Sequence, residues 1–135
     1  MATVRKREIV QLRADGDVVR ARHAARALCA ELRFSLVDQT KIVTATSELA
    51  RNTIVYGHGG TATIEFIEEG SRLGVRLTFE DQGPGIPDVE RAMQDGYSTG
   101  TGMGLGLGGS RRLVHDFDIT STPESGTRVV AVRWR

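Results

Sequence analysis

The chain has 135 residues, of which 39% are hydrophobic and 26% charged, a composition typical of globular proteins. Its 18 basic and 17 acidic residues leave a net charge of +1, so bulk electrostatics gives no reason to expect binding to nucleic acid or to a membrane. No apolar run approaches the roughly 20 residues that span a bilayer, and the N-terminus does not resemble a signal peptide. We therefore expect a cytoplasmic protein with one domain, residues 1–135, whose single cysteine, Cys29, is reduced and buried.

The N-terminal half predicts a strand followed by two helices. Weak alternation of apolar residues predicts the strand over residues 4–13. Asp17 is expected to be the N-cap of a first helix over 18–32. Apolar residues at helical spacing predict a second, longer helix over 36–56, which the glycines at and after Gly57 should end.

The C-terminal half predicts four strands and one helix. Two half-buried strands are expected near 61–66 and 73–79, with a turn between them, and an irregular stretch follows over 82–104. A third helix is expected over 105–117, and a last hairpin should pair 118–122 with 127–134. This order predicts an α+β two-layer sandwich, in which three helices cover one face of a mixed, mainly antiparallel sheet.

Glu48 and Asn52 lie four residues apart on the second expected helix, so both side chains project from the same face. A carboxylate and an amide oxygen at this spacing could share a Mg²⁺ ion, or divide the roles of base and metal ligand. The same spacing is common on solvated helix faces, so the pair taken alone favours a plain surface.

Asp81 ends an expected strand and is followed by Gly83 and Gly85. A carboxylate in this position can accept a hydrogen bond from an exocyclic amine, and the bare glycines let a flat ring approach the backbone. A Gly-Pro-Gly segment also favours a tight turn in which the aspartate acts only as a cap. Taken alone, the segment is equally consistent with a turn and with a binding site.

Glycines alternate with other residues from Gly100 to Gly106, just before the third expected helix. Successive bare N–H groups next to a helix N-terminus favour phosphate binding. The segment is not a P-loop, because no Gly-Lys-Ser/Thr follows, and not a dinucleotide fingerprint, because no βαβ unit precedes it. A flexible linker is the alternative, but Met103, Leu105 and Leu107 interleave the glycines, which is unusual for a linker.

In combination and in this order, the motifs resemble the nucleotide-binding boxes of the GHKL ATPases, the superfamily of gyrase, Hsp90, histidine kinases and MutL. The resemblance covers nearly the whole chain and ends with Gly126-Thr127 on the last hairpin. It implies the Bergerat fold, with ATP and Mg²⁺ as cofactors. It also implies that Glu48 is the catalytic base or orients water, that Asn52 is the Mg²⁺ ligand, and that Asp81 accepts the adenine amine beside Thr127.

The resemblance implies further ATP-binding residues around these. Some follow Asp81, and the others belong to a mobile, glycine-rich lid over the phosphates. They are Gly83, Gly85, Ile86, Gly100, Thr101, Gly102, Met103, Gly104 and Leu105.

Within the superfamily, the segments SELARN, EDQGPGIPD, DGYST and ESGTRVVAVRW are most similar to the RsbT-type switch kinases. The likeness implies a protein serine/threonine kinase in a bacterial stress or sigma-factor pathway. Its implied substrate is a serine on a STAS-domain antagonist protein. Its implied second partner is a PP2C-type phosphatase, which the released kinase activates.

Other functions stay open. An anti-sigma module that sequesters a sigma factor, with kinase activity secondary, would share the same site. A nucleotide sensor without catalysis is disfavoured by the presence of Glu48 and Asn52. A histidine-kinase catalytic domain would need a phosphoacceptor histidine on a pair of dimerisation helices, for which we expect no room in this length, and the three histidines stand in unrelated contexts. Arg51 could orient phosphate, meet a partner or simply lie on the surface.

Overall fold

The computed structural model describes residues 2–93 and 107–135. Five strands form one sheet in the order β1-β2-β3-β5-β4, and all four neighbouring pairs are antiparallel. The strands are β1 (Thr3–Leu12), β2 (Gly60–Glu69), β3 (Arg72–Asp81), β4 (Asp116–Thr122) and β5 (Gly126–Trp134). The expected α+β class and mainly antiparallel sheet are confirmed.

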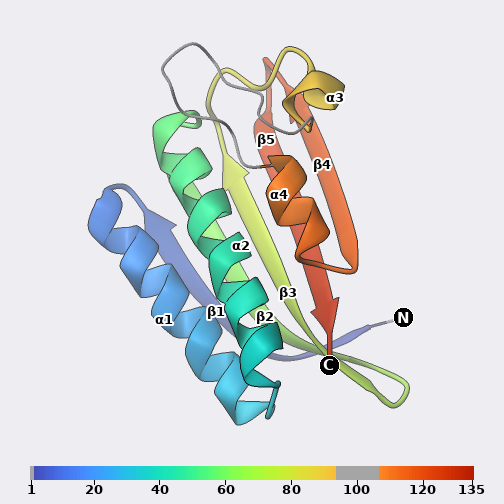
Figure 1. Ribbon diagram of the computed structural model, residues 1–135. Coiled ribbons are helices and arrows are strands. Elements are labelled where there is room, and N and C mark those ends of the chain that lie inside the picture. Colours follow the sequence, from blue (N-terminus) through green and yellow to red (C-terminus); the bar gives the residue numbers. More distant parts are fainter. Residues whose placement is uncertain (1, 94–106) are drawn as a thin grey trace.

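Three helices cover one face of this sheet, as expected (Figure 1): α1 (Asp15–Glu31), α2 (Leu36–Val55) and α4 (Leu107–Arg112). A short helix that the sequence did not indicate, α3 (Val89–Ala92), lies in the connection after β3. Within the described ranges, no helix is both long and apolar enough to cross a bilayer. In the helical layer α2 lies between α1 and α4, so it is the helix with neighbours on both sides (Figure 1).

The core lies between the helices and the sheet. Small residues on α1, among them Ala21, Ala25 and Cys29, are fully buried and let this helix pack closely against its neighbours. On α2, Ile42 and Leu49 are buried in the same cluster as the inward-facing residues of the strands. Cys29 is buried, as the sequence predicts. The packing of α2 over the sheet also fixes where its C-terminal end meets the end of β3.

The start of α1 differs from the expectation, because the helix begins at Asp15, before Asp17 rather than after it. The carboxylate of Asp17 lies in the first turn, and its Oδ2 accepts the backbone N–H groups of Arg13 at 2.8 Å and Ala14 at 3.1 Å. An acidic side chain that reaches back in this way supplies acceptors to donors that precede the helix. Asp17 therefore lies inside the first turn of α1 and is not its N-cap.

The third helix was predicted too long at its C-terminal end. The described helix ends at Arg112, and β4 begins at Asp116, two residues before the expected strand. The backbone N–H of His115 donates to the carbonyl of Val132 at 2.9 Å, and Phe117 pairs with Ala131. Pairing with β5 overrides the helical spacing of these apolar residues, because local periodicity does not record which strand lies alongside.

Candidate nucleotide-binding site

A pocket lies where the C-terminal half of α2 meets the end of β3 and the start of β5. The empty space in it is about 440 Å³, a figure that includes open solvent at its mouth. Five of the residues expected from the sequence line it: Asn52, Asp81, Gly85, Ile86 and Thr127. The other lining residues, which include most of the apolar wall, are Leu49, Thr53, Tyr56, Gly57, Phe79, Leu107 and Val129.

Asp81 is the buried carboxylate of this pocket, with 9% of the residue exposed. Its Oδ1 accepts the backbone N–H of Gly83 at 2.9 Å and that of Thr127 at 3.2 Å. Two backbone donors on one oxygen fix the orientation of the carboxylate, because the turn and the hairpin that supply them are part of the fold. Within residues 2–93 and 107–135, no hydrogen bond to its Oδ2 is found, so this oxygen can accept a donor from a ligand.

Gly57 explains how that carboxylate fits. A Cβ atom on Gly57 would lie 2.4 Å from Oδ2 of Asp81, well inside van der Waals contact. Gly83 does not line the pocket, but it packs against Gly57, where its own Cβ would lie 2.7 Å from the carbonyl oxygen. The sequence marked Gly57 only as the end of a helix, and no local signal ties it to a strand that ends at residue 81.

A chain of hydroxyl contacts holds the other side of the pocket. Ser121 on β4 has its Oγ 2.8 Å from Oγ1 of Thr127, and the same Oγ accepts the backbone N–H of Ile86 at 2.7 Å. Ile86 is thereby tied to the hairpin although it stands 35 residues from Ser121 in the chain. Ser121 was not anticipated, because a serine on an exposed-looking strand carries no motif of its own.

Glu48 and Asn52 lie one turn apart on α2, as expected, but only Asn52 lines the pocket. The side chain of Glu48 is 41% exposed, and Nη1 of Arg51 lies 3.4 Å from its Oε1. An ion pair this exposed and this long is weak. Glu48 is therefore free to exchange Arg51 for a partner that approaches from solvent.

The glycine-rich segment of the expected site lies outside the described residues. Gly100, Thr101, Gly102, Met103, Gly104 and Leu105 all belong to it. Leu107, directly after it, begins the described part of α4 and contributes an apolar side chain to the pocket wall.

Comparisons with known proteins identify the family to which the chain belongs. Residues 37–135 match the family described as the histidine kinase-, DNA gyrase B- and HSP90-like ATPases. The chain belongs to this family. It is 42% identical over 93% of its length to the serine/threonine-protein kinase RsbT of Bacillus subtilis strain 168, of which it covers 94%. It is thus an RsbT-type serine/threonine-protein kinase within the ATPase family.

More distant relatives extend the comparison. The kinase is 32% identical over 81% of its length to the anti-sigma F factor of Bacillus licheniformis, covering 78% of that protein. The RsbU and RsbW domains of a Mycobacterium tuberculosis protein superpose with a TM-score of 0.68 at 19% identity, over 96% of this chain and a third (33%) of that one. One chain from the structure of the SiaB–SiaC complex of Pseudomonas aeruginosa superposes with a TM-score of 0.58 at 12% identity, over 98% of this chain and 91% of that chain. At these identities the two solved structures support the fold alone.

Proposed function

We propose that this kinase transfers a phosphoryl group from ATP, with Mg²⁺, to a serine on a STAS-domain antagonist protein. The observation that carries the proposal is the carboxylate of Asp81, held on Oδ1 by two backbone N–H groups and open on Oδ2 in an apolar pocket. An exocyclic amine on a flat heterocycle satisfies that oxygen, and the aliphatic and aromatic walls match the faces of the ring. Adenine has this combination of features.

Asn52 suits the role of metal ligand in the same pocket. Within the described residues, no three His, Cys, Asp or Glu side chains are arranged to hold a metal ion. Mg²⁺ commonly binds to one or two protein groups and takes its other ligands from substrate phosphates and water. When bound, the ion would neutralise charge on the phosphates, and Asn52 would help to fix its place.

Glu48 suits the role of base because it stands one turn before Asn52 and is accessible from solvent. We infer that it accepts the proton of the incoming serine hydroxyl while the serine oxygen bonds to the γ-phosphorus and ADP leaves. Arg51 would then be released from its contact with Glu48 and would face the negative charge of the phosphates.

The wider setting of the kinase is part of the same proposal. We infer that residues 1–135 act as one ATPase domain in the cytoplasm, which is supported by the single core shared by helices and sheet and by the one buried thiol. A phosphorylated antagonist would release the kinase, which would then bind and activate a PP2C-type phosphatase. The similarity to RsbT supports this exchange of partners.

The direct test is to incubate the purified chain with Mg-ATP and the STAS-domain protein encoded nearest to it, and to follow acid-stable phosphate. We expect label on serine that is lost with Asn52→Ala. Glu48→Gln should keep nucleotide affinity while the transfer rate falls about 100-fold or more, because only the base is removed. A normal rate with Glu48→Gln would contradict the assignment of the base, and acid-labile label would indicate a histidine acceptor.

A second function is favoured by the relatives named anti-sigma F factor, which are about as long as this chain. In that case the chain would sequester a sigma factor, and phosphorylation would be secondary. The two functions share the nucleotide pocket, so binding partners must separate them. Tight ATP-dependent binding of a sigma factor, with no label on any STAS-domain protein, would favour the sequestering module.

A further inference from the structure

The outward face of α2 carries few charges over its first half, although helix faces that meet only water are usually charged. Leu36 and Val37 are 78% and 64% exposed, and among the described residues they are the most exposed large hydrophobic side chains. The exposed positions of the next two turns are Thr40 and Thr44. We call these four residues the α2 strip.

The neighbouring helix provides an internal comparison. The α1 helix lies in the same layer and faces the same side (Figure 1), yet its exposed residues show the usual pattern. They include Arg20, His23, Arg26 and Glu31. The exposed positions in the first half of α2 therefore differ in composition from those of α1, although both helices belong to one layer.

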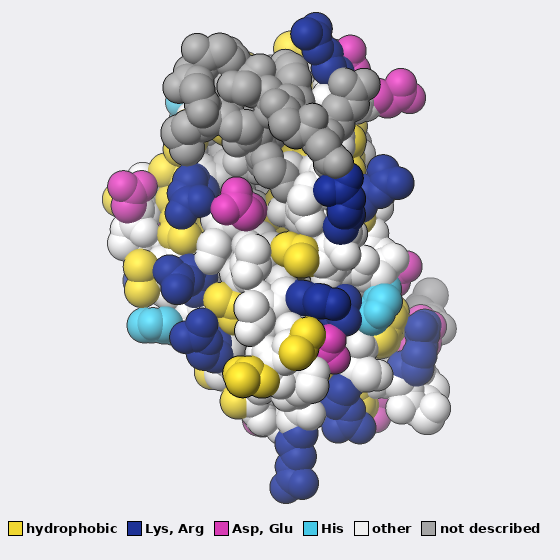
Figure 2. Space-filling model, viewed as in Figure 1, with side chains coloured by type: hydrophobic (Ala, Val, Ile, Leu, Met, Phe, Trp, Pro, Cys, Tyr) yellow, Lys and Arg dark blue, Asp and Glu magenta, His cyan; other side chains and the backbone are white. Residues whose placement is uncertain are grey.

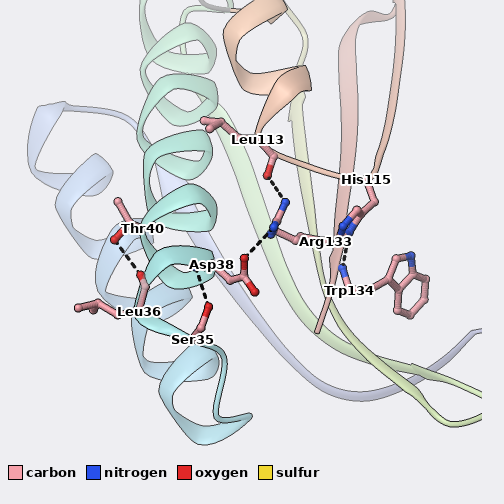
Figure 3. A network of polar contacts seen from close by, with 8 residues as sticks. All are labelled: Ser35, Leu36, Asp38, Thr40, Leu113, His115, Arg133 and Trp134. Atoms are coloured by element: carbon pink, nitrogen blue, oxygen red, sulfur yellow. Dashed lines mark hydrogen bonds and ion pairs between the residues drawn. The ribbon is translucent and has the colours of Figure 1, made fainter.

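Polar groups near the strip are directed elsewhere. The hydroxyl of Thr40 donates to the carbonyl of Leu36 at 2.9 Å, so it is satisfied by its own helix. Asp38 points away from the Leu36 side of the helix toward Arg133, at 2.7 Å, and Arg133 also donates to the carbonyl of Leu113 (Figure 3). The strip is consequently more apolar than its sequence indicates, and the acid between its residues is already paired.

Cationic side chains border the strip. Lys41 lies on α2 itself, Arg26 is exposed on α1, and Arg111 is exposed in the last turn of α4. Figure 2 shows dark blue side chains on both sides of a band of yellow and white over α2. An apolar centre with a cationic border is complementary to a protein surface with an apolar centre and an acidic border.

The strip also leads to the proposed catalytic residues. Thr44 lies one turn before Glu48, and the 16 residue-to-residue steps from Leu36 to Asn52 span about 24 Å at 1.5 Å per step. A standard interface of about 800 Å² per partner has comparable dimensions. A partner that lies along α2 would therefore reach the mouth of the pocket.

We propose that the protein substrate docks on the α2 strip through an apolar surface bordered by acidic side chains. This inference rests on the proposed kinase function. Docking along α2 would place the acceptor serine beside Glu48, at the end of the helix where the nucleotide pocket opens. The strip would then set the affinity for the substrate and leave the chemical step to Glu48 and Asn52.

The test compares Val37→Glu with Val19→Glu in the full chain. Val19 is a matched control, because it is 43% exposed on the charged face of α1. A carboxylate in the first turn of a helix is favourable, so Val37→Glu should keep the fold, which a thermal melt checks. The probe is the STAS-domain protein encoded nearest to the chain, with KM and kcat from phosphate transfer and Kd from calorimetry with a non-hydrolysable ATP analogue.

We expect Val37→Glu to raise KM and Kd for the STAS-domain protein about tenfold or more, with kcat and ATP affinity unchanged. In the complex the new carboxylate would lose its water and would face the acidic side chains of the partner. Val19→Glu should match the wild type. Lys41→Glu should weaken binding several-fold at low salt, and less as salt screens the border.

The outcomes separate this inference from the kinase function. Equal Kd for the wild type and Val37→Glu would overturn docking on the strip, whatever the rate of transfer. Binding that Val37→Glu weakens, without transfer by the wild type, would support docking and contradict the kinase function. No binding by the wild-type chain would overturn the docking of this substrate class.

Discussion

At the scale of single residues, the chemistry of the pocket depends on Asp81 and on the glycines around it. The carboxylate would be costly to bury without partners, and the backbone N–H groups of Gly83 and Thr127 supply them on one oxygen. The second oxygen, Oδ2, fits in its position only because Gly57 has no side chain. A polar group fixed on one side and open on the other is suited to select a ligand by hydrogen bonding.

Asp81→Asn should weaken ATP binding by about 1–3 kcal/mol, because the amide can present a donor where adenine also presents one. GTP should lose less, since its ring carries a carbonyl at the corresponding position. The backbone contacts to Oδ1 can persist in the variant, so the fold should be unchanged. Calorimetric titration of both nucleotides checks the prediction, and equal losses would contradict the adenine assignment.

Gly57→Ala should damage the pocket, because the added Cβ would lie 2.4 Å from the carboxylate of Asp81. We expect a loss of about 1–3 kcal/mol in unfolding free energy, as for other overpacked sites, together with weaker nucleotide binding. Gly16→Ala is the matched control, since a Cβ there meets nothing within 4 Å. That control lies inside α1 and should be neutral or slightly stabilising. Denaturant unfolding and nucleotide titration of both variants provide the comparison.

At the scale of elements, α2 connects the two ends of the molecule. Its first turn begins with Ser35, whose Oγ accepts the N–H of Asp38 at 3.1 Å, and Asp38 is tied in turn to Arg133 of β5. Its last turns carry Asn52 into the pocket. The helix therefore carries both Asn52, the residue proposed as metal ligand, and the strand contact that fixes how it lies on the sheet.

Asp38→Asn should destabilise the chain by about 1 kcal/mol at pH 7, a modest value because the pair is partly exposed. The hydrogen bond from Arg133 holds the pKa of Asp38 below its ordinary value of 3.8. A lowered pKa in the folded state means that this stabilisation is present above the unfolded pKa and is lost as the pH falls through the folded one. The difference in unfolding free energy between wild type and variant should therefore shrink below about pH 4.

Chemical unfolding at pH 7 and pH 3 measures this difference. Glu124→Gln is a suitable control, because Glu124 lies exposed in the turn between β4 and β5. A difference for Asp38→Asn that is unchanged at pH 3 would show that the ion pair contributes nothing specific to stability.

At the scale of the whole molecule, the packing of one helical layer on one sheet completely buries one face of α1. Cys29 lies on this face with 0% of its surface exposed. Burial raises the pKa of its thiol to about 12, and the charge of Asp38 contributes in the same direction. At neutral pH the reactive thiolate is therefore almost absent from the folded state.

Cys29 should accordingly resist thiol reagents in the native chain and react only when the helical layer opens. At pH 8 we expect labelling to follow the population of unfolded chain, so it should accelerate steeply as denaturant approaches the unfolding midpoint. The measurement is the labelling rate against denaturant concentration, compared with unfolding by circular dichroism. Rapid labelling without denaturant would contradict the packing of α1.

The sequence by itself determined the class of the fold, most of its elements and the order of its motifs. These features are local: apolar spacing predicted α1, α2 and the antiparallel strands, and the residues around Glu48, Asp81 and Thr127 indicated a nucleotide site. The same local signals misjudged the start of α1 and the end of the third helix, where a reaching carboxylate and a paired strand decided the boundary.

Only the tertiary structure decided which of these residues meet. Gly57 and Asp81 are 24 positions apart, and Ser121 and Ile86 are 35 apart, so their contacts depend on strand order and on how α2 lies across the sheet. The structure also separated Asn52, which lines the pocket, from Glu48, which faces solvent one turn away. Periodicity gives the face of a helix, but the distance from that face to a distant strand follows from packing alone.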